Sequence, residues 1–482
     1  MTVRVCARVP IVLLCAVCFA STAFAQTSWM RAYGGTGNEE GRAVKQTADG
    51  GYVLVGLTSS FGPGTPDSQN VYLIKTNASG DTLWTRVYGG MGTDVGTSLD
   101  LTSDGGYIVA GYTSSFGEGG LDVYLIKTDS LGDTLWTRTY GGTNTDCAYS
   151  VEQTADGGYA IAGFTFSSGV MGDFYLIKTD SAGDTLWTRI YGGSDMEFGN
   201  CLQQTADSGY IITGQTYSLN AGSSDIYLVR TDPSGDTVWT RTYGDTTSDD
   251  VGNAVQQTAE GGYIIAGYTN SFDAESSDVY LVKTNAQGET LWTRTYGGHS
   301  PDHGSMVRQT PDSGFIVVGA TESFGAGSYD AYLIKTNASG DALWTKTYGG
   351  TRSDGASSVE LTSDGGYIVA GYISSHGAGA SDAYLIKTDS TGYAPDGIHE
   401  PLTRGPARTT RLLVRPNPFT SFGRVPGHET ELFALSDVTG RQVATCRGDR
   451  IGEGLRPGVY FLSPVGSEVG KTARTTIVKA AY

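Results

Sequence analysis

Carboxylate side chains are the groups whose recurrence in this sequence could support chemistry. An acid returns at one position of a repeated segment about 52 residues long, and a second acid opens an apolar run of most copies, as at Asp122 and Asp173. The first series includes Asp94, Asp146, Glu197, Asp302 and Asp354. Calcium prefers such oxygen ligands, so these five acids are the candidate metal ligands of an acidic face. Turn formation is the competing explanation, because aspartate bonds its own backbone in turns.

A second candidate site lies at one position of the first strand predicted in each copy. This position holds polar or charged side chains that differ between copies: Lys45, Asp100, Glu152, Gln203, Gln256, Arg308 and Glu360. In a radial array the innermost strand borders a central channel, so these seven residues are the candidate channel lining and ligand-binding set. The alternative is that Lys45 and Arg308 merely offset the acids.

Motifs of nucleophilic, zinc or nucleotide chemistry are missing from the sequence, which has no G-x-S-x-G, H-E-x-x-H or P-loop. The one local histidine cluster is His299 and His303 beside Asp302, and zinc needs three or four ligands, so we interpret it as a variable loop. Paired carboxylates can cleave glycosidic bonds, but acids that recur seven times lack the asymmetry of a catalytic pair. We predict no catalytic residues, with an extracellular carbohydrate-active hydrolase as the alternative.

The repeat that must position these residues is marked by tryptophan. All seven tryptophans fall at one place of the unit: Trp29, Trp84, Trp136, Trp187, Trp239, Trp292 and Trp344. Each copy alternates apolar and polar residues in four short runs separated by Gly, Asp and Ser, which is typical of β-strands and tight turns. Four-stranded antiparallel units repeated radially form a β-propeller.

The order of the strands predicts a closed ring. The array begins with a strand of the fourth type, Ser28–Tyr33, and ends with a strand of the third type, Ala383–Thr388. The first strand would therefore complete the last blade and cover the open edges of the sheets. The predicted fold is all-β: a seven-bladed β-propeller over residues 26–393, closed by the N-terminal strand.

The segment D-S-L-G-D-T-L-W at 129–136 resembles the tryptophan-docking pattern of quinoprotein-type propellers. The resemblance covers residues 28–393 and implies a structural role for the tryptophans, with each indole packed between adjacent blades. Those enzymes need a dedicated calcium and base constellation for their quinone, which no residues here supply, so no quinone is expected. With its Y-G-G and D-G-G-Y words, the unit also resembles secreted bacterial propeller repeats fused to sorting domains.

The two ends of the chain predict export. Residues 1–25 combine Arg4 and Arg8, an apolar stretch and a small-x-small end, which is typical of a cleaved signal peptide; no other stretch is a candidate transmembrane segment. Residues 394–410 are a Pro- and Gly-containing linker. Residues 411–482 alternate short strands with Gly turns, as in a small immunoglobulin-like β-sandwich.

Four words of residues 411–482 resemble the C-terminal sorting domain of type IX secretion cargo: P-N-P-F, D-V-T-G-R, G-L-R-P-G-V-Y-F and a basic final strand. The resemblance implies that the secretion and sorting machinery is a partner of this segment. An unrelated immunoglobulin-like adhesion module is the alternative.

Charge and composition narrow the function. The net charge of −18 argues against nucleic acid, and the 12 basic against 6 acidic residues of 401–482 support a domain boundary there. Cys147, Cys201 and Cys446 are the cysteines beyond the signal segment and form no disulfide framework, although a Cys147–Cys201 bridge between neighbouring repeats stays open. We therefore predict a secreted or cell-surface binding or adhesion scaffold without enzymatic activity. A glycan or a surface protein is its expected partner, and calcium is the one cofactor considered.

Overall fold

The computed structural model describes residues 28–64, 68–168, 171–218, 223–245, 248–271, 276–395, 432–436, 441–447, 449–450, 458–464 and 475–479. The predicted signal peptide, and the predicted linker beyond residue 395, lie outside the described residues. Strands are the regular elements of the described residues, and none of these residues forms a helix. Accordingly, no described helix is long and apolar enough to cross a membrane.

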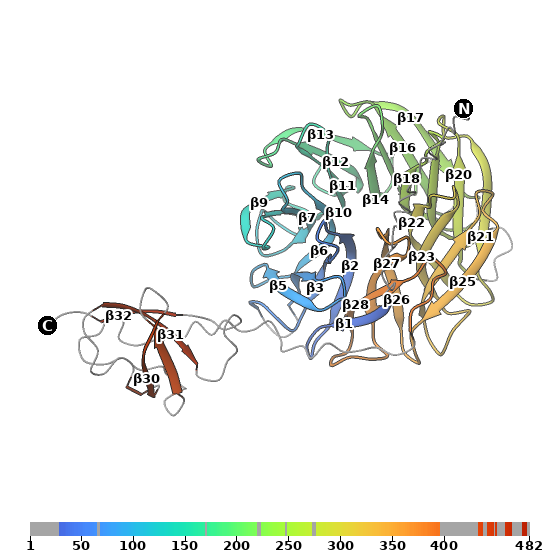
Figure 1. Ribbon diagram of the computed structural model, residues 1–482. Helices are drawn as coiled ribbons and strands as arrows, with labels where there is room; N and C mark the ends of the chain where they lie inside the picture. Colours follow the sequence, from blue (N-terminus) through green and yellow to red (C-terminus); the bar gives the residue numbers. More distant parts are fainter. Residues whose placement is uncertain are drawn as a thin grey trace, which may run out of the picture.

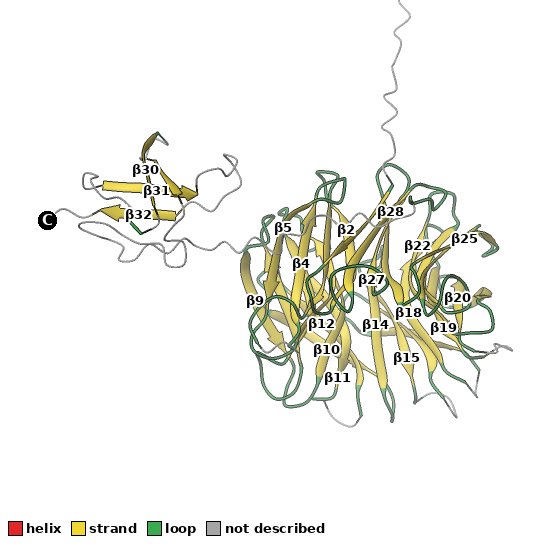
Figure 2. Cartoon of the chain, turned by 90° about the horizontal axis from the view of Figure 1, so that it is seen from below, coloured by secondary structure: helices red, strands yellow, loops and turns green. Residues whose placement is uncertain are grey.

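Seven four-stranded antiparallel sheets stand around a central axis as the blades of a propeller (Figure 1). The prediction of a seven-bladed β-propeller is therefore confirmed. Figure 2 shows the connecting loops gathered at the two ends of the strands.

The strands are given from the channel outward; they follow chain order in blades 1 to 6, and blade 7 has β1 as its outermost strand. Blade 1 is β2 (Glu39–Gln46), β3 (Tyr52–Thr58), β4 (Asn70–Thr76) and β5 (Thr82–Tyr88); blade 2 is β6 (Asp94–Leu101), β7 (Tyr107–Thr113), β8 (Asp122–Thr128) and β9 (Thr134–Tyr140); blade 3 is β10 (Asp146–Gln153), β11 (Tyr159–Thr165), β12 (Asp173–Thr179) and β13 (Thr185–Tyr191); blade 4 is β14 (Glu197–Gln204), β15 (Tyr210–Thr216), β16 (Asp225–Thr231) and β17 (Thr237–Tyr243); blade 5 is β18 (Asp250–Gln257), β19 (Tyr263–Thr269), β20 (Asp278–Thr284) and β21 (Thr290–Tyr296); blade 6 is β22 (Asp302–Gln309), β23 (Phe315–Thr321), β24 (Asp330–Thr336) and β25 (Ala342–Tyr348); blade 7 is β26 (Asp354–Leu361), β27 (Tyr367–Ile373) and β28 (Asp382–Thr388), completed by β1 (Trp29–Tyr33).

Strand β1 closes the ring as predicted. It pairs antiparallel with β28, and the register sets Trp29 opposite Lys387 and Tyr33 opposite Ala383. The two ends of the array thus share one sheet, which leaves blade 7 with the same four strands as the other blades. Closure in this way covers the strand edge that an open array would expose.

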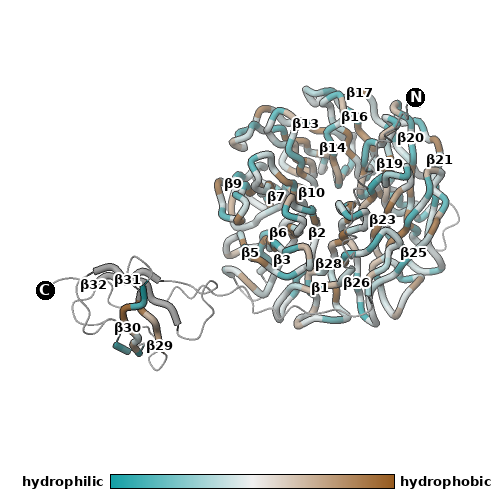
Figure 3. Tube along the Cα trace, in the orientation of Figure 1, coloured by the Kyte–Doolittle hydropathy of each residue, from teal (hydrophilic) through white to brown (hydrophobic). Residues whose placement is uncertain are grey.

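Hydrophobic side chains pack both within each blade and between neighbouring blades. The second and third strands of most blades are buried almost throughout, as in β3 and β4, whereas outer strands such as β9 alternate exposed and half-buried positions. Figure 3 shows brown hydrophobic stretches within the blades. The cores join neighbours: Val53 and Val55 of blade 1 share a cluster with Leu99 and Val109 of blade 2.

Each tryptophan packs on the next blade. The indole of Trp84 lies against Gly132, in the turn between the third and fourth strands of blade 2, where a Cβ would come within 3.0 Å of the ring. The hydroxyl of Tyr88 donates a hydrogen bond of 2.6 Å to the carbonyl of that same Gly132. The same contact joins the other six pairs: Trp29 and Gly80, Trp136 and Gly183, Trp187 and Gly235, Trp239 and Gly288, Trp292 and Gly340, Trp344 and Gly392.

The first strand of each blade is longer than the sequence pattern predicts. The alternation of apolar and polar residues at 150–154 predicts a short first strand in blade 3, but β10 begins at Asp146. The first series of acids therefore supplies the first residue of this strand: Asp146 pairs with Thr165 of β11 and accepts its hydroxyl. A bulge between Ala148 and Ser150 then shifts the register.

In the C-terminal part, the described residues form one four-stranded antiparallel sheet in the order β30-β29-β31-β32. Its strands are β29 (Leu432–Ser436), β30 (Gln442–Arg447), β31 (Gly458–Pro464) and β32 (Thr475–Lys479). The P-N-P-F word and the D-V-T-G part of the second word lie outside the described residues. The β-sandwich therefore stays a prediction.

Candidate functional site

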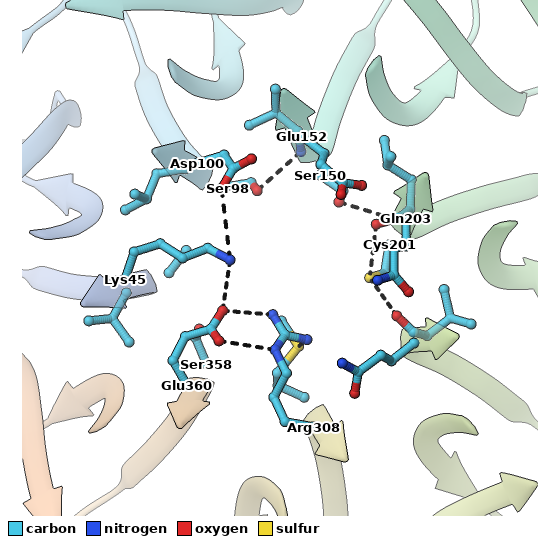
Figure 4. A pocket seen from close by; sticks show the side chains of 18 of the residues that line it. Lys45, Ser98, Asp100, Ser150, Glu152, Cys201, Gln203, Arg308, Ser358 and Glu360 are labelled. Atoms are coloured by element: carbon cyan, nitrogen blue, oxygen red, sulfur yellow. Dashed lines mark hydrogen bonds and ion pairs between the residues drawn. The ribbon is translucent and has the colours of Figure 1, made fainter. Parts of the chain in front are cut away.

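A cavity of about 340 Å³ occupies the channel between the seven innermost strands. All seven residues of the predicted channel lining border it, together with serines such as Ser98 and Ser150 (Figure 4). They meet there because each occupies the same position of the innermost strand of its blade, so radial repetition turns one sequence position into a ring.

One half of this ring neutralises itself. Lys45 Nζ lies 2.8 Å from Glu360 Oε1, and Arg308 Nη2 lies 2.9 Å from the same oxygen. Although burial alone would raise it, the pKa of Glu360 is held at about 2 by Arg308 and Lys45. For these three residues, mutual compensation of charge is what the geometry shows.

The other half of the ring is compensated less completely: Lys45 Nζ lies 3.9 Å from Asp100 Oδ1, against 2.8 Å from Glu360 Oε1. Burial raises the pKa of Glu152 to about 7, even though the backbone N–H of Gln204 donates a 2.6 Å hydrogen bond to its Oε2, and the nearby Asp100 adds to the rise. Gln203 also accepts a backbone N–H of the next blade, from Gln257 at 2.6 Å. Each of these side chains thus uses one oxygen to join blades, and Gln203 keeps an amide donor beside the cavity.

The five acids predicted as metal ligands are fully buried rather than displayed on a face: Asp94, Asp146, Glu197, Asp302 and Asp354. Protein donors hold them. Asp146 Oδ2 accepts the Gly142 N–H at 2.8 Å and the Ser167 hydroxyl at 2.6 Å. These five acids are therefore not exposed, because their side chains tie the loop before the first strand to the end of the second.

The second series of acids meets the first at the junction between blades. Asp122 Oδ1 of blade 2 and Asp146 Oδ2 of blade 3 both come within 3.0 Å of the point where a Cβ on Gly141 would lie. A side chain at that glycine would displace both oxygens. The same arrangement recurs at every junction, and we call these sets the junction pairs: Glu39 and Asp382, Asp94 and Asn70, Asp146 and Asp122, Glu197 and Asp173, Asp250 and Asp225, Asp302 and Asp278, Asp354 and Asp330.

Part of the predicted histidine cluster lies in a strand and not in a variable loop, since Asp302 and His303 begin β22. His303 lies in β22, where its Nε2 is 2.8 Å from Ser277 Oγ and its ring packs 4.6 Å from that of Tyr268. Burial lowers the pKa of His303. Throughout the described residues, no group of three or more His, Cys, Asp or Glu side chains is placed to hold a metal. Cys147 and Cys201 are both free and buried, so they form no bridge.

One set of positions in the innermost strands was not predicted from the sequence. A β-bulge in the innermost strand of every blade inserts a residue whose type varies among the copies: Arg42, Thr97, Tyr149, Asn200, Asn253, Ser305 and Ser357. Some of them join blades, as where Asn253 Nδ2 donates to the Gly304 carbonyl at 2.8 Å. Variation at one repeat position was the available signal, but the bulge itself has no sequence mark here.

The strand topology and the polar channel define the class of this chain as a seven-bladed β-propeller. No protein-family model matches it. The regulatory protein FlaEY of Caulobacter vibrioides is 28% identical over 155 residues, which cover 29% of this chain and 16% of that protein. The match therefore spans less than a fifth of that relative's length.

Solved structures similar to the chain have low sequence identity. PorZ, a bacterial surface component of the type-IX secretion system of Porphyromonas gingivalis, is 11% identical with a TM-score of 0.43, over 93% of this chain and 60% of that chain. The periplasmic gluconolactonase PpgL of Pseudomonas aeruginosa is 11% identical with a TM-score of 0.43, over 70% and 96%. Neither similarity bears on the activity of this chain.

Proposed function

We propose that this chain is a secreted or cell-surface binding protein without enzymatic activity, and that its channel holds the ligand. The observation that carries the proposal is the uneven ring. Lys45, Arg308 and Glu360 satisfy one another, whereas Glu152 and Gln203 offer polar groups to a cavity of about 340 Å³. A cavity of this size and polarity suits a small polar group, such as a sugar unit of a glycan or a side chain of a surface protein.

A hydrolytic role is less well supported. The recurring carboxylates that were candidates for glycosidic cleavage are buried at the junctions, away from any cavity described in the channel. Asp100 and Glu152 are the other two acids of the ring, and each uses one oxygen to accept a backbone N–H of the next blade. These fixed oxygens are suited to orienting a ligand, and the pKa of about 7 at Glu152 makes proton transfer by this residue the outcome that the release assay must test.

A glycan array probed with the secreted chain tests the binding proposal, with an assay for newly released reducing ends run in parallel. We expect selective binding and no release. Gln203→Ala should weaken binding at least about tenfold through the loss of one hydrogen bond in a desolvated site. Asp184→Asn, in an exposed turn on the outside of blade 3, is the matched control. Release of reducing ends that Glu152→Gln abolishes would contradict the proposal.

We further propose that residues 1–25 are a cleaved signal peptide and that residues 411–482 direct export and surface attachment. The basic excess and the four sorting-type words of the C-terminal segment support this role. A fluorescent reporter carrying residues 1–25 and 411–482 tests it in a bacterium with type IX secretion. We expect the reporter on the cell surface or in the medium, and retention in the periplasm would contradict the proposal.

A further inference from the structure

The junction pairs are built by the same contacts around the ring. At the junction of blades 2 and 3, the N–H of Asp146 donates a 2.6 Å hydrogen bond to the carbonyl of Leu121, the residue before Asp122. At the junction of blades 6 and 7, the N–H of Asp354 donates to the Tyr329 carbonyl at 2.7 Å. The main chains of adjacent blades are thus joined beside each pair, and this fixes how the two side chains meet.

The two members of a pair differ in the hydrogen bonds that they accept. In the pair of blades 6 and 7, Asp330 Oδ2 accepts the Ala326 N–H at 2.7 Å, which leaves Oδ1 directed at Gly349. Asp354 Oδ2 accepts the Gly350 N–H at 2.7 Å and also lies beside Gly349. It also accepts the Ser375 hydroxyl at 2.6 Å. Two carboxylate oxygens from different blades therefore converge on one glycine.

The junction of blades 1 and 2 distinguishes between two explanations for the facing oxygens, a proton shared between two carboxylates or a bound cation. Here an asparagine, Asn70, replaces the aspartate, and its Nδ2 donates to the carbonyls of Pro63 at 3.1 Å and Phe61 at 3.4 Å. Its Oδ1 consequently points toward Asp94 Oδ2 across Gly89. Asn70 is 1% exposed, and its Oδ1 has no hydrogen-bond partner among the described residues.

An amide beside a carboxylate would ordinarily turn its NH₂ group toward the negative oxygen. Asn70 instead presents its carbonyl oxygen, so both groups act as acceptors. The same holds at blades 4 and 5, where Asp225 is fully buried and its Oδ1 has no partner within the described part of the chain. The facing oxygens Asp94 Oδ2 and Asp250 Oδ2 do accept hydrogen bonds, so the acceptors without donors among the described residues of these two pairs are Asn70 Oδ1 and Asp225 Oδ1. A buried acceptor without a donor is costly, and a positive ion beside it removes that cost.

No basic side chain supplies this charge. Among the described residues, no Lys, Arg or His nitrogen forms an ion pair within 4.0 Å of Asp94, Asp146 or Asp330. Carboxylate and amide carbonyl oxygens are the side-chain ligands typical of calcium. We propose that the junctions between blades are binding sites for hard divalent cations of the calcium type, which fasten each blade to the next.

A pair provides only part of a calcium shell of six to eight oxygens, so backbone carbonyls and water must complete it. This proposal does not depend on the channel ligand: the junction pairs are separate from the residues that line the cavity. Loss of calcium would loosen the ring without changing any group that touches the proposed ligand.

The test uses the full chain, stripped with a chelator and dialysed against calcium. At about 1 mM calcium we expect more than one and up to seven bound ions per chain, counted by atomic emission. The melting temperature should rise by about 5 °C or more, and magnesium should raise it less. No bound calcium and no change in melting temperature would overturn the proposal, as would a melting temperature that responds to acid but not to calcium.

Variants locate the ions. Asp330→Ala removes both oxygens from one pair and should lower the count by one ion, whereas Glu322→Ala, an exposed acid in the same connection between β23 and β24, should leave it unchanged. Should Asp330→Ala fail to fold, Asp330→Asn serves, because blade 1 carries asparagine at this position. It should weaken binding at that junction, and an unchanged calcium titration for both Asp330 variants would overturn the proposal.

Discussion

Two sets of aspartates at opposite ends of the strands show how differently one residue type can be used. At the turns after the innermost strand, Asp104 lies 2.9 Å from the Nζ of Lys127, whose side chain is 4% exposed. Although burial acts to raise it, hydrogen bonds from Thr102 and Lys127 lower the pKa of Asp104 to about 2. At the junctions, by contrast, Asp122 faces Asp146, and burial and that neighbour raise the pKa of Asp122.

This difference shows at which end of the propeller the aspartates are neutralised by basic side chains of the chain itself. The turn aspartates and their buried lysines recur in most blades, in the pairs Asp49 and Lys75, Asp156 and Lys178, Asp312 and Lys335, Asp364 and Lys387, with Arg230 serving Asp207. That end of the propeller supplies its own counter-charges. The junction end does not, and this asymmetry is why the calcium-type sites are proposed there.

The largest expected effect comes from removing one of the turn aspartates that neutralise a buried lysine. Asp104→Ala leaves the ammonium of Lys127 buried, with the Thr128 carbonyl at 2.9 Å as its remaining hydrogen-bond acceptor among the described residues. We expect a loss of about 3 kcal/mol in the free energy of unfolding, measured by urea denaturation in calcium. Asp133→Ala, which removes an exposed ion pair with Arg86, is the control and should cost under about 1 kcal/mol. Equal losses for the two variants would contradict this account of the turn aspartates.

The channel repeats the same contrast on a smaller scale, between the paired Glu360 and the unpaired Glu152. Because the pKa of Glu152 is raised to about 7 in the folded protein, it stabilises the fold while protonated and loses that contribution as the pH rises through about 7. Asp100, Lys45 and Arg308 are the charged groups that act on it. Between pH 5.5 and 8, the free energy of unfolding of the wild-type chain should fall by about 2 kcal/mol more than that of Glu152→Gln.

The measurement is the free energy of unfolding across this pH range, in calcium throughout. Glu360→Gln provides the comparison, since the wild-type carboxylate is ionised over the whole range and its replacement should not flatten the same pH dependence. A pH dependence unchanged by Glu152→Gln would contradict the assignment of Glu152 as the acid of the ring that lacks a counter-charge.

The smallest expected effect is at the junction of blades 1 and 2, the one junction where an asparagine replaces the aspartate. Asn70→Asp completes a carboxylate pair with Asp94 and loses the amide hydrogen bonds to Phe61 and Pro63. In chelator it should be about 1 kcal/mol less stable than the wild type, and in calcium this deficit should shrink because the cation gains a charged ligand. Melting temperatures in both conditions check the prediction, and an equal deficit in both would count against it.

The features that could be predicted from the sequence are those that recur at a fixed position of the repeat. The tryptophan spacing, the Asp-Gly turns and the strand that opens the array sufficed for the blade count and for the closure by β1. The channel ring was also within reach, because Lys45 and its six counterparts occupy one position of one strand. All of these follow from local alternation and from the period.

The junction pairs were beyond such reasoning, since each pair joins different strands of different blades. Both acid series were visible, but nothing in their spacing shows that Asp122 turns toward Asp146 rather than toward solvent. Their burial depends on the first strand starting at Asp146, four residues earlier than its apolar pattern indicates. The bulge at Tyr149 is similarly set by pairing with β11 and has no local mark.

A crystal structure of the full chain grown in calcium, with anomalous diffraction data, tests the central claim most directly. The account predicts anomalous peaks beside Gly141, Gly244 and Gly349, each about 2.3 to 2.6 Å from one oxygen of both side chains in the pair. It also predicts a peak beside Gly89, between Asn70 and Asp94. Pairs whose oxygens lie in direct hydrogen-bond contact, with no peak at any junction, would contradict it.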